Sequence, residues 1–167
     1  YQCDWSSDVC SSDLQALPPA VEAASLDELL ARSDVVSVHA TPDAGGRPLL
    51  GAAQFALMRP DAFVVNTARG ACIDEQALAE ALRDKRIAGA ALDAFVTEPL
   101  PADSPLRSLE GVLLTPHLVG HTREMLASFG PLCLGNVLAL LAGEPPATLV
   151  NGAALARWGA RFGGVAA

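Results

Sequence analysis

The sequence is poor in basic residues. Only 11 of its 167 residues are Lys or Arg, against 19 Asp or Glu, and the formal net charge is −8. Proteins that bind nucleic acids gather Lys and Arg into a patch that neutralises phosphates, whereas here the basic residues are scattered along the chain. We therefore expect no nucleic-acid partner.

Cysteines and uninterrupted apolar runs are also scarce. The four cysteines include no C-x-x-C pair, so we expect no metal site and a reducing, cytoplasmic compartment. Residues 125–142 have the length and apolarity of a membrane span, but Ser128, Pro131 and Asn136 interrupt them. A buried or interface helix, kinked near Pro131, is expected there instead, and no membrane association.

The first residues differ in character from the rest. Residues 1–14 read YQCDWSSDVCSSDL and have no period that suits a helix or a strand. They are similar to a translated sequencing adapter joined to a genuine reading frame, with a disordered tail as the alternative, and we exclude them from the fold. On either interpretation the natural protein is expected to extend further upstream.

The rest of the chain alternates strand and helix signals. Apolar runs predict four strands, at 35–39, 63–68, 89–95 and 112–117. Caps and helical periodicity predict four helices, at 25–32, 52–58, 74–86 and about 122–142. Apolar strands separated by helices indicate an α/β fold of three layers, a parallel sheet with helices on both faces.

Polar residues lie where the predicted strands end. His39 closes the first strand, residues 66–70 the second, Asp93 the third and His117 the fourth. Ligands of open parallel sheets bind outside the carboxyl ends of the strands. The positions of these side chains therefore predict a functional site at that edge.

Three segments, in this order, resemble signature segments of the D-isomer-specific 2-hydroxyacid dehydrogenases. They are NTARG at 66–70, LDAFVTEP at 92–99 and TPHLVG at 115–120, and the resemblance extends from about Ser25 to Asn151. It implies a Rossmann-like dinucleotide-binding domain over residues 15–151, followed by a tail of uncertain structure at 152–167. The implied reaction is reversible hydride transfer between NAD, with NADP not excluded, and a small D-2-hydroxy acid or 2-keto acid.

The resemblance implies a catalytic trio. Arg69 would hold the substrate carboxylate and carbonyl, for which a permanently charged, bidentate guanidinium is suited. His117 would be the general acid/base, because histidine exchanges a proton near neutral pH. Glu98 would orient that ring and stabilise its protonated form. Singly, these residues are typical of a surface ion pair, a loop histidine and a solvated glutamate; their combination favours the catalytic interpretation.

The resemblance also implies cofactor contacts. Asp93 matches an acid at the nicotinamide end, with a turn cap as its alternative role. The full expected cofactor set is Ala40, Thr67, Ala68, Arg69, Asp93, His117 and Gly120. Val119 stands where many members have glycine, which narrows the wall of the pocket.

A glycine-rich phosphate loop is missing. The sequence has no G-x-G-x-x-G segment, which in this family opens the domain, with a ribose-binding acid about 20 positions later. We therefore expect an incomplete fold without its first β-α-β unit, and a chain that alone neither binds NAD tightly nor turns over a 2-hydroxy acid. The longer protein is expected to be a homodimer.

Two other functions stay open. One is an NAD-sensing, partner-binding protein similar to the co-repressor branch of the same family. The other is an α/β domain without activity, which leaves the placement of Arg69, Glu98 and His117 unexplained.

Overall fold

The computed structural model describes residues 21–42, 45–149, 151–152, 157 and 159. It divides into two units, Tyr1–Val119 and Gly120–Ala167, which are described separately. The predicted leader 1–14 and most of the predicted tail 152–167 lie outside the described residues. The proposed domain boundaries therefore stay predictions.

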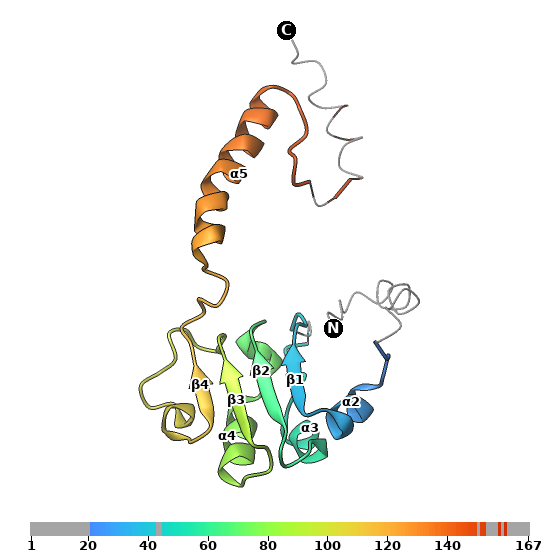
Figure 1. Ribbon diagram of the computed structural model, residues 1–167, viewed down its shortest axis with the longest axis vertical. Coiled ribbons are helices and arrows are strands. Elements are labelled where there is room, and N and C mark those ends of the chain that lie inside the picture. The colour runs from blue at the N-terminus through green and yellow to red at the C-terminus, as the bar shows by residue number, and fades with distance from the viewer. Residues whose placement is uncertain (1–20, 43–44, 150, 153–156, 158, 160–167) are drawn as a thin grey trace. The chain divides into compact units, whose positions relative to one another are not determined.

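The first unit is built on a four-stranded sheet in the order β1-β2-β3-β4 (Figure 1). The strands are Val35–Val38 (β1), Phe63–Asn66 (β2), Gly89–Leu92 (β3) and Val112–Leu114 (β4). All neighbouring pairs are parallel, and their register aligns Val38, Asn66, Leu92 and Leu114. The predicted Rossmann-like α/β class is confirmed, and the residues that follow each strand meet at one edge.

One helix precedes β1, and two others connect β1 to β2 and β2 to β3, as predicted. They are α2 (Leu26–Arg32), α3 (Ala52–Leu57) and α4 (Glu75–Arg83), with short 3-10 turns η2 (Gly70–Cys72) and η3 (Pro105–Ser108). At α2, Ser25 Oγ accepts from the Glu28 amide at 3.4 Å, and Glu28 Oε2 accepts from the Ser25 amide at 3.0 Å. Every strand ends before its predicted limit, because the residues that follow leave the sheet and form loops.

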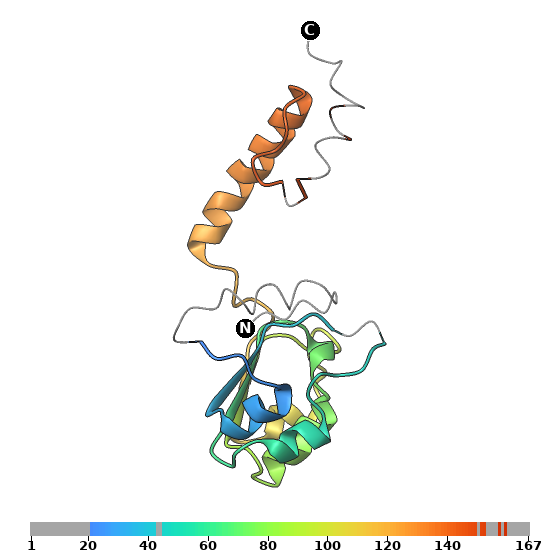
Figure 2. The ribbon, with the colours of Figure 1, turned by 90° about the vertical axis from the view of Figure 1, so that its right-hand side faces the viewer.

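Only one face of this sheet is covered by described helices of the first unit (Figure 2). Val64 and Leu92 point into the core beneath these helices and are buried, whereas Val35, Phe63 and Leu113 are 57%, 47% and 64% exposed. The expected second helical layer is not found among the described residues of this unit. Strands that are apolar throughout are suited to a sheet with both faces buried. Their composition does not determine whether a helix covers each face.

The second unit contains α5, Arg123–Leu141, which agrees with the predicted helix 122–142. Thr122 Oγ1 caps it by accepting from the Met125 amide at 3.1 Å, and the helix continues through Pro131. By length and composition it is able to cross a membrane, which is weak evidence because core helices of other proteins pass the same test. None of its residues is buried, so the predicted burial is not seen, and an interface role stays a prediction.

Candidate functional site

Asn66 organises the loop after β2. Its side chain is 1% exposed, its Nδ2 donates to the Arg69 carbonyl at 3.0 Å, and its Oδ1 accepts from the Ala68 amide at 3.0 Å. Both ends of the amide therefore fix the loop that carries Thr67 and Ala68. Asn66 is among the polar residues expected at this edge, but its part in fixing the loop was not predicted, although an Asn that begins a loop is a recognised signal for such a turn.

Arg69 is exposed at the end of this loop. Its Nη1 donates to the Ala68 carbonyl at 2.6 Å, and within the described part of the chain it forms no ion pair with a carboxylate. The surface ion pair that was the alternative role is thus not found there. A guanidinium has five N–H donors, so Arg69 retains donors for an anionic ligand.

Gly70 brings the loop after β2 against the loop after β3. A Cβ at Gly70 would lie 1.9 Å from the Phe95 carbonyl carbon and 2.2 Å from both its oxygen and the Val96 nitrogen. Backbone atoms do not approach so closely, so only glycine permits this packing. The loop of Arg69 is therefore in contact with the segment that leads to Glu98.

Glu98 is held by the backbone of its own loop. Its Oε1 accepts from the Phe95 amide at 2.9 Å, and the adjoining Val96 amide donates to Glu75 Oε1 at 2.7 Å. The Phe95 amide, followed by the hydrogen bond with His117, keeps the pKa of Glu98 below its ordinary value. Glu98 is consequently a carboxylate at neutral pH.

His117 contacts Glu98 directly. Its Nδ1 lies 2.9 Å from Glu98 Oε2 and 3.0 Å from Oε1, and the two side chains are 42% and 38% exposed. A carboxylate only accepts, so Nδ1 carries the proton of the neutral ring and Nε2 is left with the lone pair. The structure thus brings together two members of the predicted trio and leaves one ring nitrogen for proton exchange.

Asp93 binds the loop that carries His117. It is 3% exposed and accepts from Thr115 Oγ1 at 2.7 Å, from the Leu118 amide at 3.0 Å and from the Val119 amide at 3.1 Å. Burial raises the pKa of Asp93, but these hydrogen bonds and the nearby His117 outweigh it, so the pKa lies below the ordinary 3.8. The alternative role as a turn cap is present; the cofactor contact stays a prediction.

Acid is expected to release this loop. Because the pKa of Asp93 is lower in the folded chain, its charge stabilises the fold above the ordinary pKa of 3.8, and the contribution is lost as the pH falls through the folded pKa. Thermal unfolding between about pH 7 and about pH 2.5 checks this. In the unsubstituted chain we expect Tm to decrease as the pH drops below about 4. Asp93→Asn is expected to have a lower Tm at neutral pH and a smaller decrease of Tm in acid. Equal acid-induced decreases in the two chains would exclude Asp93 as the cause.

The other predicted site residues are placed less closely. Ala40 is buried just beyond β1, and its carbonyl accepts from Cys72 Sγ at 3.3 Å. Gly120 is the first residue of the second unit, so its position relative to the rest of the site is not described. No direct contact of Arg69 with Glu98 or His117 is found among the described residues. Within those residues, no cluster of three or more His, Cys, Asp or Glu is suited to a metal.

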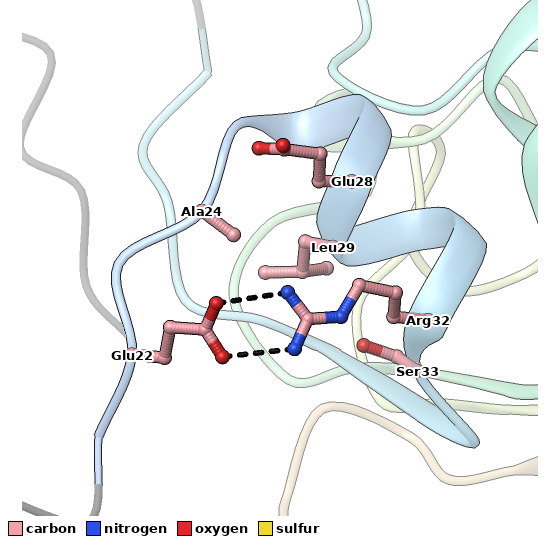
Figure 3. Close-up of a pocket in the computed structure, with 6 residues that line it drawn as sticks. All are labelled: Glu22, Ala24, Glu28, Leu29, Arg32 and Ser33. Atoms are coloured by element: carbon pink, nitrogen blue, oxygen red, sulfur yellow. Dashed lines mark hydrogen bonds and ion pairs between the residues drawn. The ribbon is translucent and has the colours of Figure 1, made fainter.

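Two pockets lie away from these residues. One, of about 270 Å³, is lined by Glu22, Ala24, Glu28, Leu29, Arg32 and Ser33 (Figure 3). Its main feature is the bidentate pair between Arg32 and Glu22, at 2.9 and 2.8 Å, and such exposed pairs contribute little. The other, of about 630 Å³, includes Ala88 and Gly111, which precede β3 and β4. Neither contains a member of the predicted trio.

The chain is similar to one family of enzymes. The profile described as "D-isomer specific 2-hydroxyacid dehydrogenase, NAD binding domain" matches residues 8–119. The match begins within the predicted leader 1–14 and includes Arg69, Glu98 and His117.

Individual relatives agree with this match. A glyoxylate reductase of Thermofilum pendens is 40% identical over 139 residues, which are 83% of this chain and 41% of that protein. Among solved structures, the TT0316 protein from Thermus thermophilus has a TM-score of 0.72 and 38% identity, over 81% of this chain and 44% of that one. D-lactate dehydrogenase with NAD+ from Lactobacillus jensenii has a TM-score of 0.68 and 32% identity, over 77% and 42%. The chain thus spans about two-fifths of the length of these proteins.

Proposed function

The chain belongs to the D-isomer-specific 2-hydroxyacid dehydrogenase family, and we propose that it supplies the acid–base part of an NAD(P)-dependent active site. The reaction is reversible hydride transfer between the cofactor and a D-2-hydroxy acid or 2-keto acid. The observation that carries this proposal is the hydrogen bond between Glu98 and His117 Nδ1 at the carboxyl edge of the sheet. It prepares Nε2 for proton exchange.

His117 moves the proton in this proposal. In oxidation Nε2 takes the proton of the substrate hydroxyl, and in reduction the protonated ring returns it to the carbonyl oxygen. Glu98, a carboxylate at neutral pH, stabilises the protonated ring and keeps Nδ1 turned away from the substrate. When bound, the nicotinamide takes up or supplies the hydride.

Arg69 binds the substrate carboxylate. Its one described hydrogen bond holds the guanidinium against the Ala68 carbonyl, and the donors that remain match a planar anion. Asn66 fixes the backbone from which Arg69 projects. The substrate is therefore held by a residue after β2 and deprotonated by a residue after β4.

The residues present fit the nicotinamide end of the cofactor. Asp93 Oδ2 accepts a single described hydrogen bond, so it keeps a lone pair for an amide donor. Thr67 and Ala68 are half-buried at the same edge, and Ala40 and Gly120 complete the proposed contacts. The sequence holds no G-x-G-x-x-G loop for the pyrophosphate, and the weak NAD binding expected of the chain alone stays a prediction.

The co-repressor alternative is not supported, because the two relatives reported above whose names state an activity are a reductase and a dehydrogenase. A homodimeric assembly and a cytoplasmic location are further proposals, which rest on the family resemblance and on the cysteine content.

A chimaeric enzyme tests the proposal. The aligned segment of the Thermofilum pendens glyoxylate reductase is replaced by that of this chain, and consumption of NADH or NADPH is followed with glyoxylate and other 2-keto acids. We expect turnover that depends on the keto acid. Arg69→Ala is expected to remove most of this turnover. Arg83→Ala replaces an exposed arginine at the end of α4 and is expected to keep it. A folded chimaera that oxidises neither cofactor with any keto acid would refute the proposed function.

A further inference from the structure

Two more carboxylates bind the backbone of the loops that carry Glu98 and His117. We infer that these carboxylates, Asp93 and Glu75, are positioning residues that bring Glu98 and His117 into contact. The importance of these two residues for the reaction rests on the proposed function, whereas their effect on the contact between Glu98 and His117 does not.

Asp93 encloses the turn at His117. Its Oδ1 accepts from Thr115 Oγ1 and from the Leu118 amide, and its Oδ2 accepts from the Val119 amide. The donors lie two residues before His117 and one and two residues after it. A single buried carboxylate directly after β3 therefore ties down both sides of the loop that follows β4.

The backbone of His117 needs this support. Its φ is 58°, in the left-handed region where the Cβ of any residue other than glycine is crowded. Such a conformation persists when the surrounding contacts determine it. Here the hydrogen bonds that the Leu118 and Val119 amides donate to Asp93 do so. Without them the turn relaxes and the ring leaves Glu98.

Glu75 acts on the other loop. It is the first residue of α4 and is half-buried, and its Oε1 accepts from the Val96 amide at 2.7 Å. The preceding amide, that of Phe95, donates to Glu98 Oε1. Gly70 packs against the peptide group that joins Phe95 to Val96. The Phe95–Val96 segment is thus fixed from two sides, and it is this segment that orients Glu98.

The direction in which the pKa of Glu98 changes distinguishes a positioning role of Glu75 and Asp93 from a purely electrostatic effect of their charges. Removing the negative charge of Glu75 or Asp93 lowers the pKa of Glu98 by electrostatics alone, because a nearby like charge disfavours a carboxylate. Releasing either loop instead takes away the hydrogen bonds from Phe95 or His117 that keep this pKa below its ordinary value. Positioning therefore predicts a rise where electrostatics predicts a fall.

Carbon NMR of the 167-residue chain measures this pKa in four variants. Glu75→Ala and Asp93→Asn are expected to move the pKa of Glu98 upward. Asp93→Asn is also expected to make exchange of the Val119 amide several-fold faster, because an amide nitrogen in place of Oδ2 no longer accepts from it. Glu75→Gln keeps the accepting oxygen, and Glu80→Ala removes an exposed charge one turn along α4. Neither of these two variants is expected to raise the pKa.

A pKa of Glu98 that falls or stays unchanged in both Glu75→Ala and Asp93→Asn would overturn the inference. So would an equal rise in Glu80→Ala. If Asp93→Asn does not fold, Thr115→Val removes one donor to the same carboxylate and decides in its place. The titration needs no cofactor, substrate or turnover, so an inactive chimaera together with the expected rises would refute the proposed reaction and leave the positioning intact.

Discussion

Replacing His117 by alanine in the chimaeric enzyme is expected to lower kcat by about 10²–10⁴-fold, the usual contribution of a general acid/base. The imidazole Nε2 is the atom left for proton transfer, since Nδ1 is bound to Glu98. KM for the keto acid should change far less, because Arg69 rather than His117 is proposed to bind its carboxylate. Steady-state assays at several keto-acid concentrations separate the two parameters.

His121→Ala is the matched control for this experiment. His121 is exposed, like His117, and has no proposed role in the reaction. Its replacement should leave kcat within about threefold of the parent, which corresponds to less than about 1 kcal/mol in the barrier. If the two alanine variants lost activity to the same extent, His117 would have no special role as an acid/base.

Gly70→Ala is expected to destabilise the chain by about 3 kcal/mol or more, at the upper end of the costs of overpacking. The added Cβ would lie 1.9 Å from the Phe95 carbonyl carbon, and the obstacle is backbone rather than a side chain that is able to rotate. Denaturant unfolding followed by circular dichroism measures the loss. The loop of Arg69 must also move away from the segment that orients Glu98, so the pKa of Glu98 should rise in any fraction that folds.

Gly51→Ala provides the comparison within the same unit. A Cβ there meets the Gln54 side chain at 3.6 Å, which is ordinary contact, and Gly51 is the N-cap of α3 with φ of −124°. The expected cost is about 1 kcal/mol or less, because alanine is a poorer N-cap than glycine. Similar losses for Gly51→Ala and Gly70→Ala would mean that the close packing on Phe95 is not a requirement of the fold.

The amino-acid sequence alone is sufficient to predict the four strands and four α-helices of the described residues, though not the 3-10 turns η2 and η3, and to predict the edge on which the polar residues gather. The capping box at Ser25, the cap at Asp74 and the apolar run at 63–66 each act within a few residues, so they can be recognised without a structure. Parallel strands then carry the residues that follow them to one edge. The contact between Glu98 and His117 is an expectation that only the family resemblance supplies, because Glu98 does not follow directly on a strand.

The hydrogen bonds of Glu75 and Asp93 that hold this contact in place could not be predicted, because they join residues far apart in the chain. Glu75 and Val96 are separated by 21 positions, and Asp93 lies 25 and 26 positions from the amides it binds. Such contacts depend on sheet register and on the left-handed turn at His117, and no local pattern encodes either. The tertiary structure also decides which face of the sheet is covered, since Phe63 and Val64 are both apolar but only Val64 is buried. Local propensity selects each element, whereas packing between distant segments decides which side chains meet.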